Sequence, residues 1–216
     1  KLSAGYGGGS WIPVWYVPDF DDVNEIISQL EFPTLSKNGL FMNGGGGKGP
    51  IGKGLFIGGM GAGCGITRKK DVTLSDSTRV TRKMKYDIGY GGVTLTKRIP
   101  FSRKLVSLVE LMLGWGRAKL EILQKDGNYD WNIEDDLDSP DHNYYVKMEK
   151  KFIALHPKVG LMYRITSWLG VRATAGYIYT YSFKPDWTAN EDFDVVDSKN
   201  TKFSGYTFTI GPWFGF

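Results

Sequence analysis

The sequence predicts an all-β protein: a closed antiparallel up-and-down transmembrane β-barrel of eight strands, with residues 1–216 forming a single domain. Three observations lead to this fold class. Apolar and polar residues alternate along several segments, as they do on a strand with two different faces. Short and long connections also alternate, which is typical of bacterial membrane barrels. Glycine supplies 29 residues and aromatic side chains 14%, a combination that is unusual for a soluble core.

Composition and charge argue against several other classes of protein. The strongest apolar run, residues 105–115, is interrupted by Glu110 and falls short of the ~18 residues that a membrane-spanning helix needs. The net charge of +4 is too small to indicate a nucleic-acid partner. The single cysteine, Cys64, rules out an intramolecular disulfide and is expected to be a small strand residue. No basic-then-apolar leader precedes Lys1, so we expect a mature chain whose export signal is absent from this sequence.

Four segments carry the clearest strand patterns. Residues 168–183 alternate Leu, Val, Ala and Tyr with Gly, Arg, Thr and Ser, and residues 205–216 alternate in the same way. Residues 105–116 and 155–164 follow the same design. In each segment one face is apolar or aromatic and the other is small, polar or charged. We therefore predict four strands whose two faces meet different surroundings.

Two earlier segments have less regular faces. The apolar positions of residues 55–66 change parity at the glycine pair 58–59, and those of residues 86–95 change at the pair 91–92. A β-bulge at each pair would restore one apolar face, because a bulge inserts one extra residue into a strand. We therefore predict two strands that each contain a bulge.

Connections complete the predicted topology. Two glycine-rich stretches, residues 2–9 and 39–47, are the remaining strand candidates, although glycine here could also mark flexible loop. Tight connections are expected at residues 48–53, 100–103 and 165–167. Long polar connections are expected at about residues 10–38, 68–78, 124–145 and 184–201. This alternation places both termini on the side of the short turns.

The first long connection contains a predicted helix, at about residues 19–31. Its apolar residues recur at helical spacing, and Asp19, Asp21 and Asp22 are favourably placed at its N-terminus. The helix could be a lid over the barrel mouth, could lie in the membrane interface, or could only pack on the loops.

The end of the chain resembles a known class of protein. Its last eight residues, 209–216, look like the C-terminal recognition signal of outer-membrane barrels. The positions that fill this signal are Thr209, Gly211, Phe214 and Phe216. Residues 163–172 are likewise similar to the strand-turn-strand links of small barrels in the outer-membrane protein A, X and W groups. The resemblance implies an outer-membrane location and a final strand that the barrel assembly machinery reads.

Two prolines depart from this pattern. Pro157 and Pro212 lie inside predicted strands, and neither can donate a hydrogen bond to its neighbours. Either bulges absorb them or the strand boundaries differ from those given above.

Parity predicts a cluster of charges inside the barrel. Glu110, Lys158 and Arg172 all point inward from consecutive strands, at comparable distances from the short turns. Opposite charges should pair there, and eight strands leave an interior just wide enough for side chains. We therefore predict a sealed polar lumen, with a narrow passive pore for small solutes as the alternative.

Catalysis is not expected, and neither is a cofactor. His156 is predicted to face inward, whereas parity places the hydroxyl of Ser107 outward, so the two cannot act together. A lipid-modifying membrane enzyme is the least favoured alternative.

The loops could hold the partners of this chain. Acidic residues gather at 134–141 and 191–197, where calcium binding is possible but a solvated loop is favoured. Basic residues gather at 68–85 and could pair with the phosphates of outer-membrane lipids. The charged loops could also let barrels form a homo-oligomer.

Alternation alone does not say which face is inside. A soluble lipocalin-like binder of an apolar ligand would reverse every assignment. Against it stand the terminal Phe216, the loop asymmetry and the charges on the glycine-rich face. Aromatic residues near the strand ends could form two interfacial girdles: Trp11, Trp15, Tyr16, Trp168, Tyr181, Phe183, Trp213 and Phe216. The sequence therefore favours an integral outer-membrane barrel with a structural or cell-surface interaction role.

Overall fold

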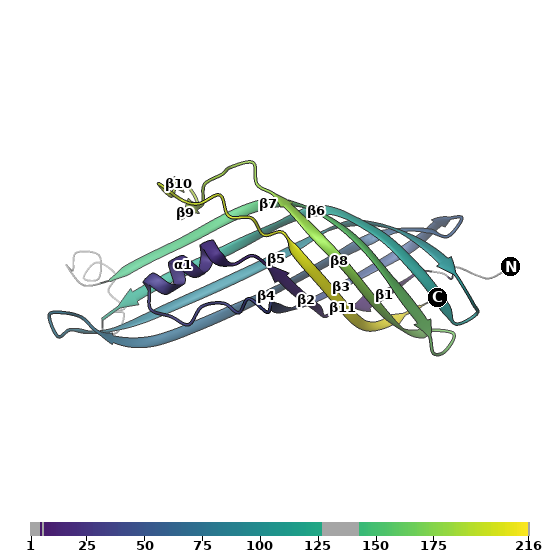
Figure 1. Ribbon diagram of the computed structural model, residues 1–216, viewed down its shortest axis with the longest axis horizontal. Helices are drawn as coiled ribbons and strands as arrows, with labels where there is room; N and C mark the ends of the chain where they lie inside the picture. Colours follow the sequence, from purple (N-terminus) through teal and green to yellow (C-terminus); the bar gives the residue numbers. More distant parts are fainter. Residues whose placement is uncertain (1–4, 6, 127–142, 216) are drawn as a thin grey trace, which may run out of the picture.

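The strands of the computed structural model form a ring that continues on one side into a long sheet (Figure 1). The structure describes residue 5 and residues 7–126 and 143–215. Its elements in chain order are β1 (Gly8–Trp11), β2 (Val14–Pro18), α1 (Asp21–Gln29), β3 (Leu40–Gly52), β4 (Leu55–Thr73), β5 (Arg79–Pro100), β6 (Leu105–Lys125), β7 (Tyr144–Arg164), β8 (Leu169–Tyr181), β9 (Thr188–Ala189), β10 (Phe193–Asp194) and β11 (Gly205–Phe214).

The ring has eight strand positions, and two short strands share the first. β1 and β2 both pair with β3 on one side and with β11 on the other. From β3 the ring continues through β4, β5, β6, β7 and β8 to β11, with antiparallel pairing at every step. The predicted fold class is therefore confirmed, and it is the fold that the resemblance to small outer-membrane barrels implied.

The predicted connection at residues 10–38 is wrong at its start. Residues 14–18 form β2, in which buried Val14 and Tyr16 alternate with the more exposed Trp15. Ile12 and Pro13 separate this strand from β1, and a proline interrupts a ladder because it has no N–H to donate. The true connection starts after Pro18, and it contains α1 as predicted.

The turn between β3 and β4 lies later than predicted. Gly52, Lys53 and Gly54 have φ angles of 115°, 50° and 74°, so the chain reverses through three left-handed residues. Glycine adopts such angles without a steric penalty. The predicted turn at residues 48–53 therefore began too early, and Lys48 belongs to a strand.

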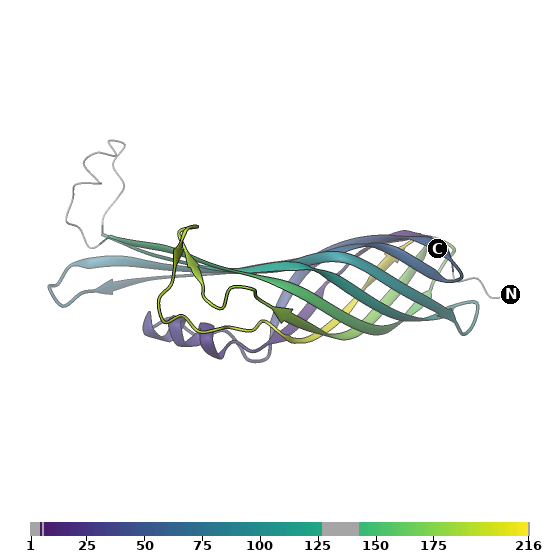
Figure 2. The ribbon, with the colours of Figure 1, turned by 90° about the horizontal axis from the view of Figure 1, so that it is seen from above.

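The four longest strands extend beyond the ring (Figure 2). β4 to β7 contain 19, 22, 21 and 21 residues, compared with 13 in β8 and 10 in β11. The predicted long connection at residues 68–78 is consequently wrong, because β4 and β5 stay paired as far as Thr73 and Arg79. In the predicted connection at residues 124–145, the strands run to Lys125 and restart at Tyr144. Most of that connection, including the acidic residues 134–141, lies outside the described residues.

Neither predicted bulge exists. The β4–β5 ladder has a single uninterrupted register from Leu55 to Thr73. The apolar side chains change face because the barrel interior becomes apolar farther along the strands. Ile57 and Leu95 face outward and are about half exposed, whereas Met60 and Tyr90 face inward and are buried. Beyond the glycine pairs, on the side away from the short turns, the interior of the barrel is apolar.

The two prolines lie where the pairing with a neighbouring strand is interrupted. Pro157 lies between Leu155 and Lys158, the flanking β7 residues that pair with β8, and has no β8 partner itself. Pro212 lies opposite the interruption between β1 and β2. Both positions therefore require no donated hydrogen bond, and the registers on either side show no bulge.

Helix α1 lies along the inner face of the extended sheet. Val23 and Ile27 are buried in the same apolar cluster as Met84 and Leu120 of the sheet. The ring of Phe20 contacts Tyr86 of β5 edge to face, with centroids 6.2 Å apart. The helix therefore packs against the inner face of the sheet just beyond the ring (Figure 1).

The outer face of the ring carries an apolar belt. Its members include Leu111, Leu113, Val159, Phe208 and Ile210, all at least 45% exposed. The lipocalin-like arrangement, with the apolar face of these strands turned inward, is contradicted by this orientation.

Of the predicted girdle residues, Trp168 and Tyr181 face outward, but Tyr16 and Trp213 are buried inside, and Phe216 is outside the described residues. No helix in the described part of the chain is long and apolar enough to cross a bilayer.

Candidate functional site in the lumen

The three predicted lumen charges meet in the half of the barrel nearer the short turns. Glu110 lies opposite Lys158 in the β6–β7 register, and Arg172 projects from β8 toward the same point. Their side chains are 1%, 2% and 7% exposed. Inward-facing positions of neighbouring strands fall at one level of a barrel, so strand register brings these residues together.

Glu110 is the centre of the cluster. Its Oε1 lies 2.5 Å from Lys158 Nζ, and its Oε2 accepts hydrogen bonds from Arg172 Nη2 and Thr96 Oγ1, each at 2.8 Å. Lys48 Nζ also contacts Glu110 Oε2 and donates to Thr96 Oγ1 at 2.7 Å. Multiple charge-assisted bonds of this kind compensate a buried carboxylate for the loss of water.

Four members of the site were missed by sequence reasoning: Lys48, Thr96, Arg98 and Trp213. Lys48 was assigned to a turn, although its parity matches that of the inward residues Leu40 and Met42 on β3. Trp213 was counted among the girdle aromatics, although it shares the parity of inward Thr207. In both cases strand parity was the signal, and correct strand boundaries were needed to use it.

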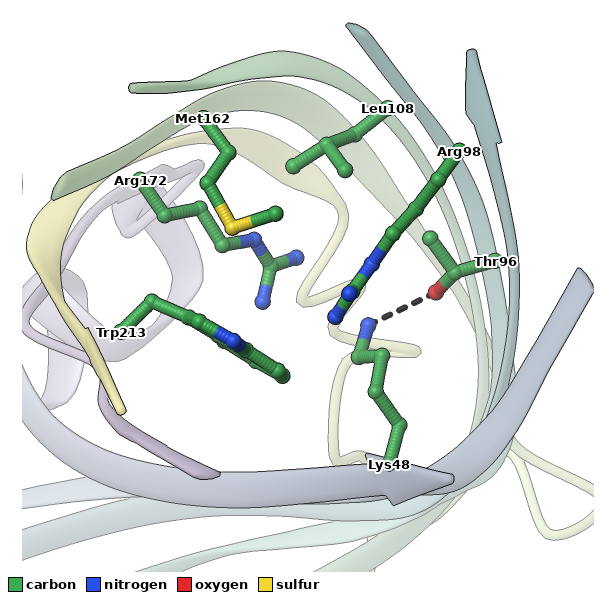
Figure 3. A pocket seen from close by; sticks show the side chains of 7 residues that line it. All are labelled: Lys48, Thr96, Arg98, Leu108, Met162, Arg172 and Trp213. Carbon is green, nitrogen blue, oxygen red and sulfur yellow. Dashed lines mark hydrogen bonds between the residues drawn. The ribbon is translucent and has the colours of Figure 1, made fainter. Parts of the chain in front are cut away.

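Three cationic groups converge beside the Trp213 ring (Figure 3). The Arg98 guanidinium carbon lies 3.9 Å from the ring centroid of Phe56 and 4.8 Å from that of Trp213. Arg172 and Lys48 each approach the Trp213 centroid to 6.0 Å. The negative face of an aromatic ring attracts cations, so Trp213 partly balances their charge.

Among the described residues, buried cations outnumber buried carboxylates at this level of the barrel. Lys48, Arg98, Lys158 and Arg172 are all buried, and Glu110 is the only buried carboxylate in the described part of the chain. The space that Figure 3 looks into is too narrow for a water molecule.

A second polar layer lies above the charges and offers no catalytic arrangement. His156 Nε2 is 2.7 Å from Thr207 Oγ1, and its ring packs edge to face on Tyr90 with centroids 5.7 Å apart. Ser107 lies on the outward parity of β6, as predicted, and does not meet His156. Both members of the His156–Thr207 pair are buried, so a substrate cannot reach them.

The residues that resemble the C-terminal signal of outer-membrane barrels lie in different environments. Thr209 exchanges a hydrogen bond of 2.6 Å with Thr174 of β8, while Phe214 faces outward and stacks on Trp168 with centroids 6.5 Å apart. Gly211 is partly buried inside the ring, and Phe216 lies outside the described residues.

The outer face of the extended sheet changes abruptly from apolar to charged. On β6, Trp115 is 72% exposed and lies opposite Ile153, whereas the next outward residue, Arg117, lies opposite Lys151. Directly opposed like charges destabilise a sheet unless something neutralises them. Arg117 forms no ion pair with the described residues, and Lys151 approaches only Glu149, at 3.6 Å.

Two lysines on the extended sheet pair with carboxylates in the segments beside it. Glu31 accepts a hydrogen bond of 2.7 Å from Lys70, which holds the pKa of Glu31 below its usual value, and Lys147 pairs with Glu191 at 3.0 Å. The acidic residues near Glu191 and elsewhere in residues 5, 7–126 and 143–215 form no group that could hold a metal ion.

Comparisons with known proteins reveal similarity at the level of the fold. No protein-family model matches the chain, and no curated protein matches it. The chain is similar to Ail, the attachment invasion locus protein of Yersinia pestis, in complex with the heparin analogue sucrose octasulfate: the TM-score is 0.42 and the identity 11%, over 98% of this chain and 97% of that one. A second Ail structure gives a TM-score of 0.39 at 12% identity, covering 98% and 99%. CarO2 of Acinetobacter baumannii gives 0.37 at 10% identity, covering 98% of each chain.

Proposed function

We propose that this chain is an outer-membrane β-barrel without catalytic activity, whose sealed lumen anchors a rigid sheet for interactions at the cell surface. The observation that carries the proposal is the change on the outer face of β6, where exposed Trp115 is followed by Arg117. An exposed apolar belt that ends in aromatic residues and then charge is what a lipid bilayer requires of a barrel.

The lumen charges support a plug and not a pore. The Glu110 carboxylate joins side chains from β3, β5, β7 and β8, so its contacts span most of the ring. An interior of eight strands has room for little besides such side chains. A small solute would have to break several buried ion pairs to pass, which opposes the alternative of a narrow passive pore.

The extended sheet supports the surface role. β4 to β7 continue past the belt, and α1 covers their inner face with buried Val23 and Ile27. The opposite face is solvent-facing and carries charges, including Arg117, Lys119 and Lys151. A sheet that is backed by a packed helix presents these side chains in fixed positions, which is what specific recognition needs.

The charged residues at the edge of the apolar belt favour outer-membrane lipids as the partner. Arg117 and Lys151 lie one outward position beyond Trp115 and Ile153, which is where lipid phosphates would meet the barrel. A phosphate between the two cations would remove their mutual repulsion. We also keep the assembly role of Thr209, Gly211, Phe214 and Phe216 as a proposal, since the barrel machinery would read this final strand.

Cysteine labelling on intact cells tests the orientation. Lys69→Cys and, as its control, Lys53→Cys would each be made in a Cys64→Ala background and treated with a membrane-impermeant maleimide. Lys69 lies on the extended sheet and Lys53 in a short turn at the other end, so only Lys69→Cys should react before the cells are permeabilised. Equal labelling of both sites in intact cells would contradict the proposal.

Bilayer conductance tests the seal. The purified folded chain should produce no steady current above the baseline of a planar bilayer, because the ion pairs of Glu110 close the lumen. Reproducible unitary openings in the unmodified chain would favour the pore instead.

A further inference from the structure

A lysine interrupts the outward apolar face of β5. Lys97 lies between Leu95 and Ile99 on that face, and its cross-strand neighbours are Leu55 of β4 and Val109 of β6. Leu95, Ile99 and Val109 are 46%, 44% and 50% exposed. A charged side chain on the lipid-facing surface of a barrel is costly unless its charge reaches the polar headgroup layer. The direction of the Lys97 side chain therefore decides how this charge is accommodated.

The ammonium group of Lys97 reaches the turn between β3 and β4. Its Nζ donates a hydrogen bond of 2.6 Å to the backbone oxygen of Lys53, which is itself exposed. A long cationic side chain behaves in this way at a membrane interface, because its methylene groups stay among apolar neighbours while its charge moves outward. Two lysines therefore lie at the short-turn edge of the apolar belt.

The ionisable residues of all three short turns are basic. The turns comprise residues 53–54, 101–104 and 165–168, and they contain Lys53, Arg103 and Lys104 but no acidic residue. They lie at the end of the barrel opposite the extended sheet (Figure 2). Phe101 and Ile165 in these turns are 64% and 53% exposed. Cations at the border of an exposed apolar surface are suited to the phosphates of anionic lipids.

We infer that Lys97 and Lys53 bind the phosphate group of an anionic glycerophospholipid in the leaflet at the short turns. The acyl chains of this lipid lie on Ile57, Leu95 and Leu111, which face one another across β4, β5 and β6. These side chains are one outward position nearer the middle of the belt than Lys97, and each is 45–47% exposed. The inference rests on the membrane position proposed above, but it concerns the other edge of the belt.

Native mass spectrometry of the full folded chain tests the site. The protein would be released from detergent micelles that contain equal amounts of phosphatidylglycerol and phosphatidylcholine. One phosphatidylglycerol should be retained in preference to phosphatidylcholine. Lys97→Met and Lys53→Met should each lower the apparent affinity for phosphatidylglycerol roughly five-fold, because each removes one lysine from the bound phosphate. Lys97→Met should fold, since an unbranched apolar side chain suits the belt.

Lys83→Met is the matched control, because it removes the same charge from the outer face of the extended sheet. It should keep the full affinity for phosphatidylglycerol. Equal retention of the two lipids, or an equal loss of affinity in all three variants, would overturn the inference. Displacement of phosphatidylglycerol by millimolar inorganic phosphate would also overturn it, because the lysines would then bind a free anion without contact to a lipid chain.

Fluorescence quenching separates this inference from the membrane position on which it rests. Trp115 and Trp168 are 72% and 58% exposed on the outer face, so phosphatidylcholine with brominated acyl chains should quench their emission. Quenching without a preference for phosphatidylglycerol would overturn only the phospholipid site. Absence of quenching would overturn the membrane position and, with it, this inference.

Discussion

Glu110 and Lys158 face each other across the β6–β7 ladder, and the carboxylate lies 2.5 Å from the ammonium group. The strand register alone brings the two together. Because the same carboxylate also contacts Lys48 and Arg172, it is the residue on which the charge balance of the lumen depends.

Glu110→Gln should therefore destabilise the barrel strongly. Among the described residues it removes the only carboxylate that Lys48, Lys158 and Arg172 contact, and loss of the partner of a buried charge typically costs about 3–5 kcal/mol. Glu121→Gln on the outer face of the same strand is the control and should stay within about 0.5 kcal/mol. Urea unfolding in lipid vesicles measures both, and similar midpoints for the two variants would contradict the structural role of Glu110.

Ile27→Ala should lower the local stability of the extended sheet but not that of the barrel. Ile27 of α1 is fully buried against the extended strands, and loss of such a side chain costs about 2–5 kcal/mol. Exposed Gln29→Ala is the control. Hydrogen exchange should become faster in β4 and β5 beyond the belt and stay unchanged around Leu111. Faster exchange throughout the barrel would show that α1 is not a separate cover.

Arg117→Gln and Lys151→Gln should each weaken association with anionic lipid. A basic residue near an anionic surface contributes about 1 kcal/mol, so each change should lower the affinity by roughly five-fold, and less at high salt. Lys83→Gln, farther along the extended sheet, is the control and should have little effect. Lipid binding can be measured by co-purification with a phosphate-bearing glycolipid. Equal loss in all three variants would indicate a general charge effect.

The contact between Glu31 and Lys70 should respond to acid. Lys70 donates a hydrogen bond to Glu31 and lowers the pKa of that carboxyl from 4.5. A lowered folded-state pKa means that the contact stabilises the fold above pH 4.5 and loses this effect as the pH falls through the folded value. Carboxyl NMR should place the Glu31 titration below 4.5 and return it to that value in Lys70→Met. Identical titrations in both proteins would contradict the contact.

The sequence predicted the ring and three lumen charges because parity survives within a strand. Glu110, Lys158 and Arg172 each belong to a segment whose alternation is clear, so their inward direction followed directly. Lys48 was missed because the glycines around it have no side chains from which parity can be read. The same reading predicted bulges at residues 58–59 and 91–92, since it assumed that the apolar face of a strand always points outward.

The extended sheet could not be predicted in this way. Lys69, Lys83 and Arg82 made residues 68–85 look like a polar loop, whereas the structure pairs these residues in one ladder. Outside a bilayer, a sheet face in water carries charges as readily as a loop does. Composition therefore marked where the apolar belt ends, and not where the strands end.

The most direct test of the account is the position of the bilayer on the outer face. Nitroxide labels would be attached at Leu113→Cys and Lys119→Cys in a Cys64→Ala background, and their collisions with oxygen and with a water-soluble nickel complex compared in lipid vesicles. Because Leu113 belongs to the exposed belt and Lys119 lies beyond Trp115, the label at 113 should meet oxygen and the label at 119 should meet nickel. If both labels meet nickel equally, the belt is not in lipid and the proposed membrane role is wrong.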